Sequence, residues 1–396
     1  MHDDDLAARF RLTYDREGGR RLIAGHEVII HCHHYNARIQ STVEGATQID
    51  GRALLSSSAE AVFAPLVRAA CAPADSEAER WRAAAALYAH LGYGRLDLSR
   101  LGEGLVVQTA SHFVEGWNAG FRGRNAPVCT FTEGFLQGAA HAAAGQLVYA
   151  RERACMAAGA SACLFELEPG RREPPAAFAK RPVAFAPTPG GEYARSPNVD
   201  ERAIIEALVE MPIRGDREGL IPAFGVYLAN MPADFYNLVS IRFVEAMAQQ
   251  GLFKSACRLL TYDAETCGMN TFRGIMSSAE WDGLVAPMIK EPADNFFAVV
   301  AISNALGWGN WHPLEHEAGE RARLESRNGY EALGYLGYRG TSRQAQCFML
   351  TGVAAGIMEL LYADGPIESR FGRFAPSEGA CICTGSPSCT FEVTRV

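Results

Sequence analysis

Two repeated cysteine clusters are the residues of this chain whose types and spacing suit metal binding. In the first cluster, Cys129 heads a Gly/Ala-rich apolar run, and the pattern Glu-x-x-Cys-x7-Cys begins 23 residues later. Three thiolates and one carboxylate are then available to a single cation. Thiolate sulfur favours zinc among the abundant divalent ions, and four protein ligands leave no open position for water. We therefore expect a closed, structural zinc site built from Cys129, Glu152, Cys155 and Cys163.

The same pattern returns near the end of the sequence. Glu-x-x-Cys-x7-Cys keeps its spacing, whereas the distance from the leading cysteine to the glutamate grows from 23 to 31 residues, which indicates a loop insertion. A repeat of this kind indicates duplicated structural units. We expect a second site, and hence one or two zinc ions per chain, in which Cys383 could replace the carboxylate. Its ligands would be Cys347, Glu378, Cys381 and Cys389.

A histidine-rich run, HCHHYN, follows an apolar stretch in the first half of the chain only. Alternation along an extended strand would place His31 and His33 on one face. Joined by His26 or His112, they could bind a transition metal or haem, act as a general base, or hydrogen-bond a ligand hydroxyl. A purely structural role is the remaining interpretation. Catalytic residues stay unassigned, because neither a nucleophile motif nor a GxGxxG or GxxxxGK[ST] pattern is present.

Helical and extended patterns alternate around these residues, which predicts an α+β fold. A capping box formed by Ser76 and Glu79 is expected to open a helix. Another helix should begin at Cys129, and a third should cover the run VDERAIIEALVEM. The expected strands are 28–30, 96–98, 105–107, 146–151 and 164–167.

A Pro/Gly-rich stretch, residues 169–198, has no sustained periodicity and reads as a linker. It divides the chain into units 1–168 and 199–396. The second unit repeats features of the first, since LGYG at 91–94 returns as LGWG at 306–309. We expect two units of one fold, packed about a pseudo-twofold axis.

The overall composition limits the possible partners and compartment. The 396 residues are 48% hydrophobic and 21% charged, with a formal net charge of -8. Acidic chains lack the basic surface used to bind nucleic acid or anionic membranes. No secretory leader and no apolar run of membrane-spanning length is evident, so we expect a cytoplasmic protein with no membrane or nucleic-acid partner. Its eleven cysteines then favour metal ligation or buried thiols over disulfides.

Both halves resemble the 4-vinyl-reductase domain, a small-molecule-binding module. It occurs in a bacteriochlorophyll-synthesis protein and in the sensory region of phenol- and xylene-responsive activators. The resemblance rests on the two cysteine patterns and covers residues 90–167 and 305–396. It implies that both sets of four residues are zinc ligands. It also implies two tandem copies of an α/β domain similar to the Bet3 family, which usually dimerises and encloses an apolar pocket near the zinc.

The resemblance and the residues together suggest a pocket for a hydrophobic or aromatic small molecule. Where the phenol sensors place a pocket tryptophan, this sequence has Gln108, so phenol specificity is not supported. The other expected pocket residues follow at near-helical spacing, and packing of this helix on the core is the alternative interpretation. They are Phe113, Trp117 and Phe121.

Three functional hypotheses follow. The first is a zinc-stabilised sensor or carrier that holds a hydrophobic or aromatic ligand, either as a homodimer or as a pseudo-dimer of its two halves. The second is an accessory protein or metalloenzyme of tetrapyrrole or aromatic metabolism, which would use His26, His31 and His33. The third is a scaffold with degenerate pockets. We rank them in this order and do not expect enzymatic activity.

Overall fold

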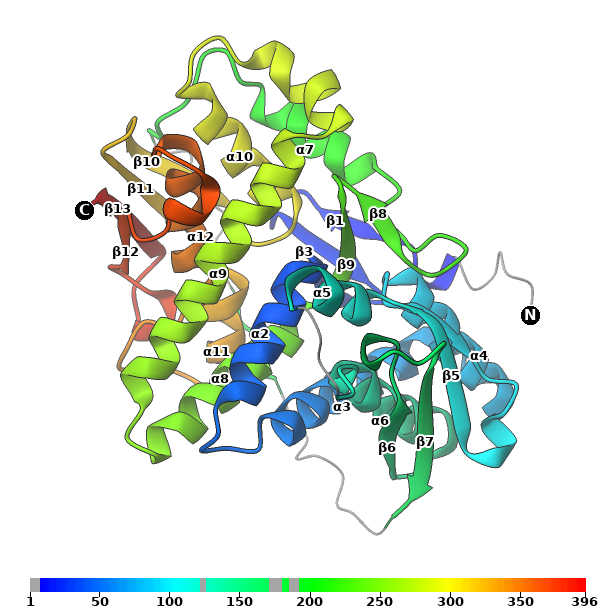
Figure 1. Ribbon diagram of the computed structural model, residues 1–396. Helices are drawn as coiled ribbons and strands as arrows, with labels where there is room; N and C mark the ends of the chain where they lie inside the picture. The colour runs from blue at the N-terminus through cyan, green and yellow to red at the C-terminus, as the bar shows by residue number, and fades with distance from the viewer. Residues whose placement is uncertain (1–7, 122–125, 171–179, 185–191) are drawn as a thin grey trace.

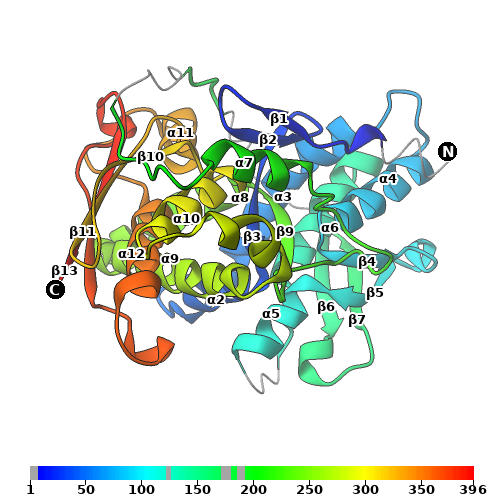
Figure 2. The same ribbon diagram turned by 90° about the horizontal axis from the view of Figure 1, so that it is seen from above.

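The computed structural model describes residues 8–121, 126–170, 180–184 and 192–396. Its fold mixes helices with antiparallel sheets, which confirms the predicted α+β class. Two four-stranded sheets lie on opposite sides of the molecule, and strands of a five-stranded sheet lie between them (Figure 1 and Figure 2). Helices fill the space between the sheets.

The first four-stranded sheet has the strand order β4-β5-β7-β6. Helix α6 packs on this sheet and against the long helix α3. The two helices approach closely because α6 carries Gly134 and Gly138 at the contact. A Cβ atom added to Gly134 would lie 2.1 Å from the carbonyl oxygen of Ser56. The elements are β4 (Gly94–Asp97), β5 (Leu105–Ser111), β6 (Val148–Ala154), β7 (Cys163–Pro169), α3 (Gly51–Ala70) and α6 (Thr130–Ala144).

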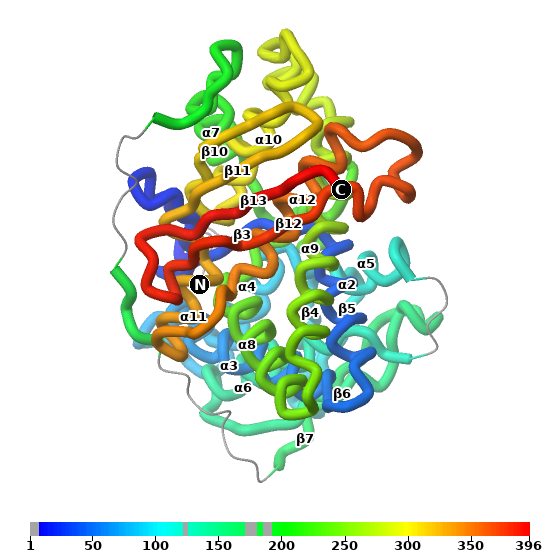
Figure 3. Tube along the Cα trace, turned by 90° about the vertical axis from the view of Figure 1, so that its left-hand side faces the viewer, coloured from blue at the N-terminus to red at the C-terminus, as the bar shows by residue number. Residues whose placement is uncertain are grey.

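The second four-stranded sheet has the equivalent order, β10-β11-β13-β12, and covers helix α12 (Figure 3). Helix α12 packs against the long helix α9 through Gly352 and Gly356. A Cβ atom at Gly352 would lie 2.1 Å from the carbonyl oxygen of Thr261. The elements are β10 (Trp311–Glu317), β11 (Arg321–Ser326), β12 (Phe374–Glu378), β13 (Cys389–Arg395), α9 (Phe253–Met276) and α12 (Phe348–Tyr362).

The five-stranded sheet, of order β1-β2-β3-β9-β8, combines strands from both halves of the chain. Its centre is the antiparallel pair β3 and β9, in which Ile30 lies opposite Asn230. The side chains of β3 from Val28 onward are buried, as the apolar run predicts. The elements are β1 (Thr13–Asp15), β2 (Arg20–Ile23), β3 (His26–Cys32), β8 (Ile221–Ala223) and β9 (Val226–Pro232).

Reciprocal hydrogen bonds tie each half to the central strand of the other. Asn230 N donates to the Leu91 carbonyl, and Ile30 N donates to the Leu306 carbonyl, each at 2.9 Å. The aromatic residues of LGYG and LGWG repeat this exchange: the Tyr93 hydroxyl donates to Asn230 O at 2.8 Å, and Trp308 Nε1 donates to Ile30 O at 3.0 Å. The two predicted units are therefore interleaved.

The other helices complete the packing. Helix α4 begins with the predicted capping box, which is confirmed: Glu79 N donates to Ser76 Oγ at 3.3 Å, and Ser76 N donates to Glu79 Oε2 at 2.8 Å. The helix predicted after Val199 is α7. The bounds are α2 (His33–Gly45), α4 (Glu77–His90), α5 (His112–Gly120), α7 (Glu201–Glu210), α8 (Ala233–Gln249), α10 (Asp294–Ala305) and α11 (Tyr330–Arg339).

Much of the predicted linker, namely residues 171–179 and 185–191, lies outside the described residues. Between these segments, Arg181 N donates to the Gly337 carbonyl at 3.0 Å, and Lys180 pairs with Asp234 at 2.7 Å. This short stretch thus lies against the second half. Within the described part of the chain, every helix is too short or too polar to cross a membrane.

Candidate metal centres and an apolar cavity

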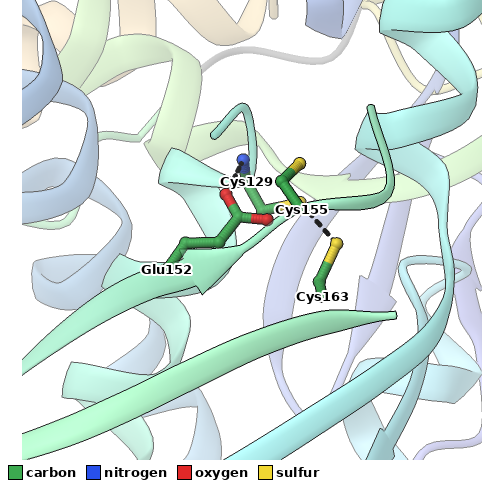
Figure 4. A group of neighbouring side chains, drawn as sticks. All are labelled: Cys129, Glu152, Cys155 and Cys163. Atoms are coloured by element: carbon green, nitrogen blue, oxygen red, sulfur yellow. Dashed lines mark hydrogen bonds between the residues drawn. The ribbon is translucent and has the colours of Figure 1, made fainter. Parts of the chain in front are cut away.

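The structure brings together the four predicted ligands of the first cluster (Figure 4). Cys129 is the N-cap of α6, Glu152 lies on β6, Cys155 follows that strand, and Cys163 begins β7. All four residues are buried, and one donor atom from each lies within 4.8 Å of the others. The cluster thus joins the start of a helix to a β-hairpin.

Glu152 is placed as a ligand by the different environments of its two oxygens. Oε2 accepts a hydrogen bond from Cys129 N at 2.8 Å, whereas Oε1 is buried without a hydrogen-bond partner. Burial raises the pKa of this carboxyl to about 8. A cation beside Oε1 would satisfy the unpaired oxygen and favour the ionised form.

Local backbone geometry positions the two hairpin thiols. Cys155 and Cys163 are joined by a short turn in which Gly159 adopts a φ of +93°, a conformation that favours glycine. Met156 N points at Cys163 Sγ, 3.4 Å away. Because backbone N–H groups stabilise thiolates, this turn prepares the sulfur to bind a cation.

The second cluster repeats this arrangement. The Sγ atom of Cys347 lies 3.9 Å from that of Cys381 and 3.6 Å from that of Cys389. Glu378 Oε2 accepts from Cys347 N at 2.8 Å, and its Oε1 is again unpartnered. Burial raises the pKa of Glu378 to about 9. Both carboxylates therefore hold the first cysteine's backbone with one oxygen and leave the other for a metal.

Cys383 lies beside the second set of four ligands. Its Sγ is 3.1 Å from that of Cys381 and 3.6 Å from the Gln344 carbonyl, to which it donates. The group of four converging donors contains Glu378 and not Cys383. The carboxylate is thus the better placed of the two alternatives.

Each cluster has the chemistry of a structural zinc site. Three thiolates and one carboxylate complete a tetrahedral shell, and the cysteines of both clusters are buried. A metal held there would fasten the β-hairpin to the helix, and binding energy of this kind contributes directly to folding.

The histidine run is arranged differently from the expectation. Strand β3 ends at Cys32 and helix α2 begins at His33, so the shared strand face predicted for His31 and His33 is wrong. The physical reason is that the strand alternation stops where the helix starts. The second half makes the same transition, since β9 ends at Pro232 and α8 begins at Ala233.

His31 lies inside the central core. Its ring stacks between Tyr35, with centroids 4.5 Å apart, and Trp308, with centroids 5.1 Å apart. Burial lowers its pKa to about 3, and its Nε2 atom has no hydrogen-bond partner. His31 is therefore a neutral core residue.

The other histidines make separate contacts. His33 Nδ1 accepts from Tyr227 N at 3.1 Å, and the buried His112 accepts from the Asn36 amide at 2.8 Å through Nε2. His26 lies at the opposite end of β3. Among the described residues, the groups of three or more metal donors that converge are the two cysteine clusters. The geometry thus gives no support to iron or haem at the histidines.

A small internal cavity lies next to the first cluster, between elements of both halves. Its volume is about 10 Å³. Of the predicted pocket residues, only Phe113 lines it. Gln108 instead donates to the Tyr88 hydroxyl at 3.1 Å, while Trp117 packs edge-on against Phe121. The lining residues are Asn36, Ile39, Gln40, Leu55, Phe113, Phe131 and Phe235.

Sequence reasoning missed two of the cavity's aromatic residues. Phe131 follows Cys129 by two positions, and this proximity to a metal ligand was a usable signal. Phe235 comes from α8 in the other half, and the register of the interleaved halves was needed to place it. The ring centroids of Phe131 lie 4.5 Å from Phe113 and 4.9 Å from Phe235.

Comparison with known proteins agrees with the first cluster. Residues 118–169 match the family model of the 4-vinyl-reductase domain, and this segment contains all four ligands of the first cluster. This segment is 4-vinyl-reductase-like. The second cluster lies outside the residues matched to that model.

The 4-vinyl-reductase-like chain is also similar to one solved structure, described as the phenol-responsive sensory domain of the transcription activator PoxR with phenol. The two share 17% sequence identity and a TM-score of 0.36, and the match covers 50% of this chain and 90% of that one. No curated protein matches the sequence.

Proposed function

We propose that this protein is a zinc-stabilised small-molecule-binding protein that holds a hydrophobic or aromatic ligand and acts as a sensor or carrier. The observation that carries the proposal is the cavity walled by Phe113, Phe131 and Phe235, beside the first metal cluster. Apolar walls with a few polar groups are typical of small-molecule sites. Here Asn36 and Gln40 supply the polar groups.

The first metal cluster supports the cavity through helix α6. Cys129 caps this helix and Phe131 lies in its first turn, so a metal at Cys129 would fix the position of the Phe131 ring. Gln40, at the polar end, donates to Val128 O at 2.7 Å and to Thr130 Oγ1 at 3.2 Å. Metal binding and cavity shape are thus physically connected.

Ligand binding would have to enlarge the cavity. A volume of about 10 Å³ holds roughly one water molecule, whereas a dry protein cavity that binds benzene measures about 150 Å³. The three phenylalanine rings would turn or move apart to admit a ligand. Because Phe235 belongs to the second half, this movement would be transmitted between the halves, as a sensor requires.

We further infer that the chain consists of two copies of one unit, related by a pseudo-twofold axis. Support comes from the equivalent strand orders, the two matching clusters, and the reciprocal hydrogen bonds at Tyr93 and Trp308. Each copy would hold one structural zinc ion. The pseudo-dimer would then supply, within one chain, the contacts that two chains supply in a dimer.

The proposal is tested by filling the cavity. Purified protein would be examined by native mass spectrometry for a bound organic molecule, and titrated with toluene and naphthalene. Leu55→Phe places a ring in the cavity and should lower affinity at least tenfold. Leu54→Phe is the matched control, because the neighbouring Leu54 does not line the cavity. Equal binding by both variants, or no binding by the wild type, would reject the proposal.

A further inference from the structure

A surface groove lies between helix α9, the start of α12 and the edge strand β12, next to the second metal cluster. Its volume is about 510 Å³, within the range of small-molecule sites. Three aromatic residues line it: Tyr262 is 48% exposed, while Phe348 and Phe374 are buried. The groove is separate from the apolar cavity of the first half.

A pair of buried carboxyl groups lies at the inner end of this groove. Glu265 lines the groove and is only 7% exposed, and its carboxyl is in hydrogen-bond contact with that of the fully buried Glu359. Such a contact requires a proton from one of the two. Glu359 Oε1 accepts from Arg373 N at 2.9 Å, whereas its Oε2 finds no donor group.

The equivalent place in the first half is built without this conflict. There, Glu60 on α3 accepts a hydrogen bond at 3.1 Å from the side-chain amide of Gln137 on α6. The Gln137 carbonyl oxygen also accepts from Ala150 N on the neighbouring strand, as Glu359 does from Arg373. The second half therefore has a carboxyl where the first half has an amide donor. Two buried carboxyls are costly for folding, which points to a ligand rather than to a packing role.

We propose that this groove binds a small primary amine with an apolar or aromatic body. Its ammonium group, with three N–H donors, would lie between Glu265 and Glu359 and satisfy the unpartnered oxygen. The organic body would pack against Phe348 and Phe374, and the exposed ring of Tyr262 would close over it, an arrangement that also favours a cation. Arg258 is exposed at the groove and leaves the inner end acidic.

The test compares two probes of similar shape, phenethylamine and 2-phenylethanol, by isothermal titration calorimetry on the full-length, metal-loaded protein. The amine should bind at least tenfold more tightly than the alcohol. Glu359→Gln, which restores the amide of the first half, should reduce amine affinity at least tenfold. Equal binding of the two probes, or no amine binding, would overturn the proposal.

Two further variants keep the result interpretable. Tyr262→Ala alters only an exposed wall of the groove and should weaken amine binding about threefold without unfolding the protein. Glu60→Gln is the control in the first half and should leave amine affinity unchanged. If Glu60→Gln weakens binding as strongly as Glu359→Gln does, the amine binds elsewhere and the proposed site is wrong.

Discussion

The two cysteine clusters have the same donors, but their surroundings differ. Around the first, Glu152 is buried and an aromatic cavity lies close to Cys129. Around the second, Glu378 is partly exposed and borders an open groove, and Cys383 adds a neighbouring thiol. The difference teaches that the metal-binding framework can stay constant while the adjacent space changes in shape and polarity.

The histidines add a second contrast between the halves. In the first half, His31 and His112 are fully buried and neutral, whereas His316 of the second half is only partly buried. The first half has therefore taken on buried groups that resist protonation. The comparison can be sharpened or broken by the following experiments.

Removing one cysteine ligand should have the largest effect. We expect Cys155→Ser and Cys381→Ser each to lower the free energy of unfolding by several kcal/mol, because structural zinc contributes on the order of 10 kcal/mol of binding energy in small domains. Urea denaturation would measure the loss. Cys71→Ser, at a partly buried cysteine outside both clusters, is the control and should change little. Unchanged stability of either ligand variant would show that its cluster is not a metal clamp.

Acid should destabilise the protein through His31. Its pKa is about 3 in the folded state and about 6.5 when unfolded, so below pH 6.5 the unfolded state takes up a proton that the folded state excludes. Between about pH 7 and about pH 4.5 this group alone should remove roughly 2–3 kcal/mol of stability. His31→Phe, which keeps a ring between Tyr35 and Trp308, should flatten the profile.

The comparison for this pH profile is His316 in the second half, which stacks on Phe296 with centroids 4.1 Å apart. Burial lowers its pKa to about 4, but solvent reaches part of the side chain, so His316→Phe should flatten the profile less. Equal slopes for the wild type and His31→Phe would contradict the assignment of His31 as a buried neutral group.

The reciprocal contacts between the halves should have a moderate effect. Tyr93→Phe removes the hydroxyl that donates to Asn230 O and leaves a buried carbonyl short of one donor, at a cost of about 1–3 kcal/mol. Tyr262→Phe, at an exposed tyrosine, should cost almost nothing. Thermal unfolding of both variants measures the difference. A neutral Tyr93→Phe would mean that the interleaving does not depend on this bond.

Cys383→Ala should have the smallest effect. Because Cys383 lies outside the four converging donors, its loss should leave the metal content unchanged and stability within about 1 kcal/mol of the wild type. The opposite substitution in the first cluster, Ala157→Cys, should be similarly mild. Loss of one metal ion in Cys383→Ala would instead make this thiol a ligand in place of Glu378.

The parts predicted from the sequence are those that depend on short-range spacing. Both ligand sets converge as expected because Glu-x-x-Cys-x7-Cys spans a single β-hairpin, and the box at Ser76 forms within one helical turn. The strand face of His31 and His33 failed because the switch from strand to helix falls between them. The cavity could not be placed, since Phe131 and Phe235 meet only through tertiary packing of both halves.

The central claim is that each half holds one structural metal ion in the same way. Elemental analysis of the purified wild type, Cys155→Ser and Cys381→Ser tests it most directly. The account predicts two zinc ions per chain in the wild type and one in each variant. A wild-type protein with one zinc or none, or a variant that keeps both ions, would contradict it.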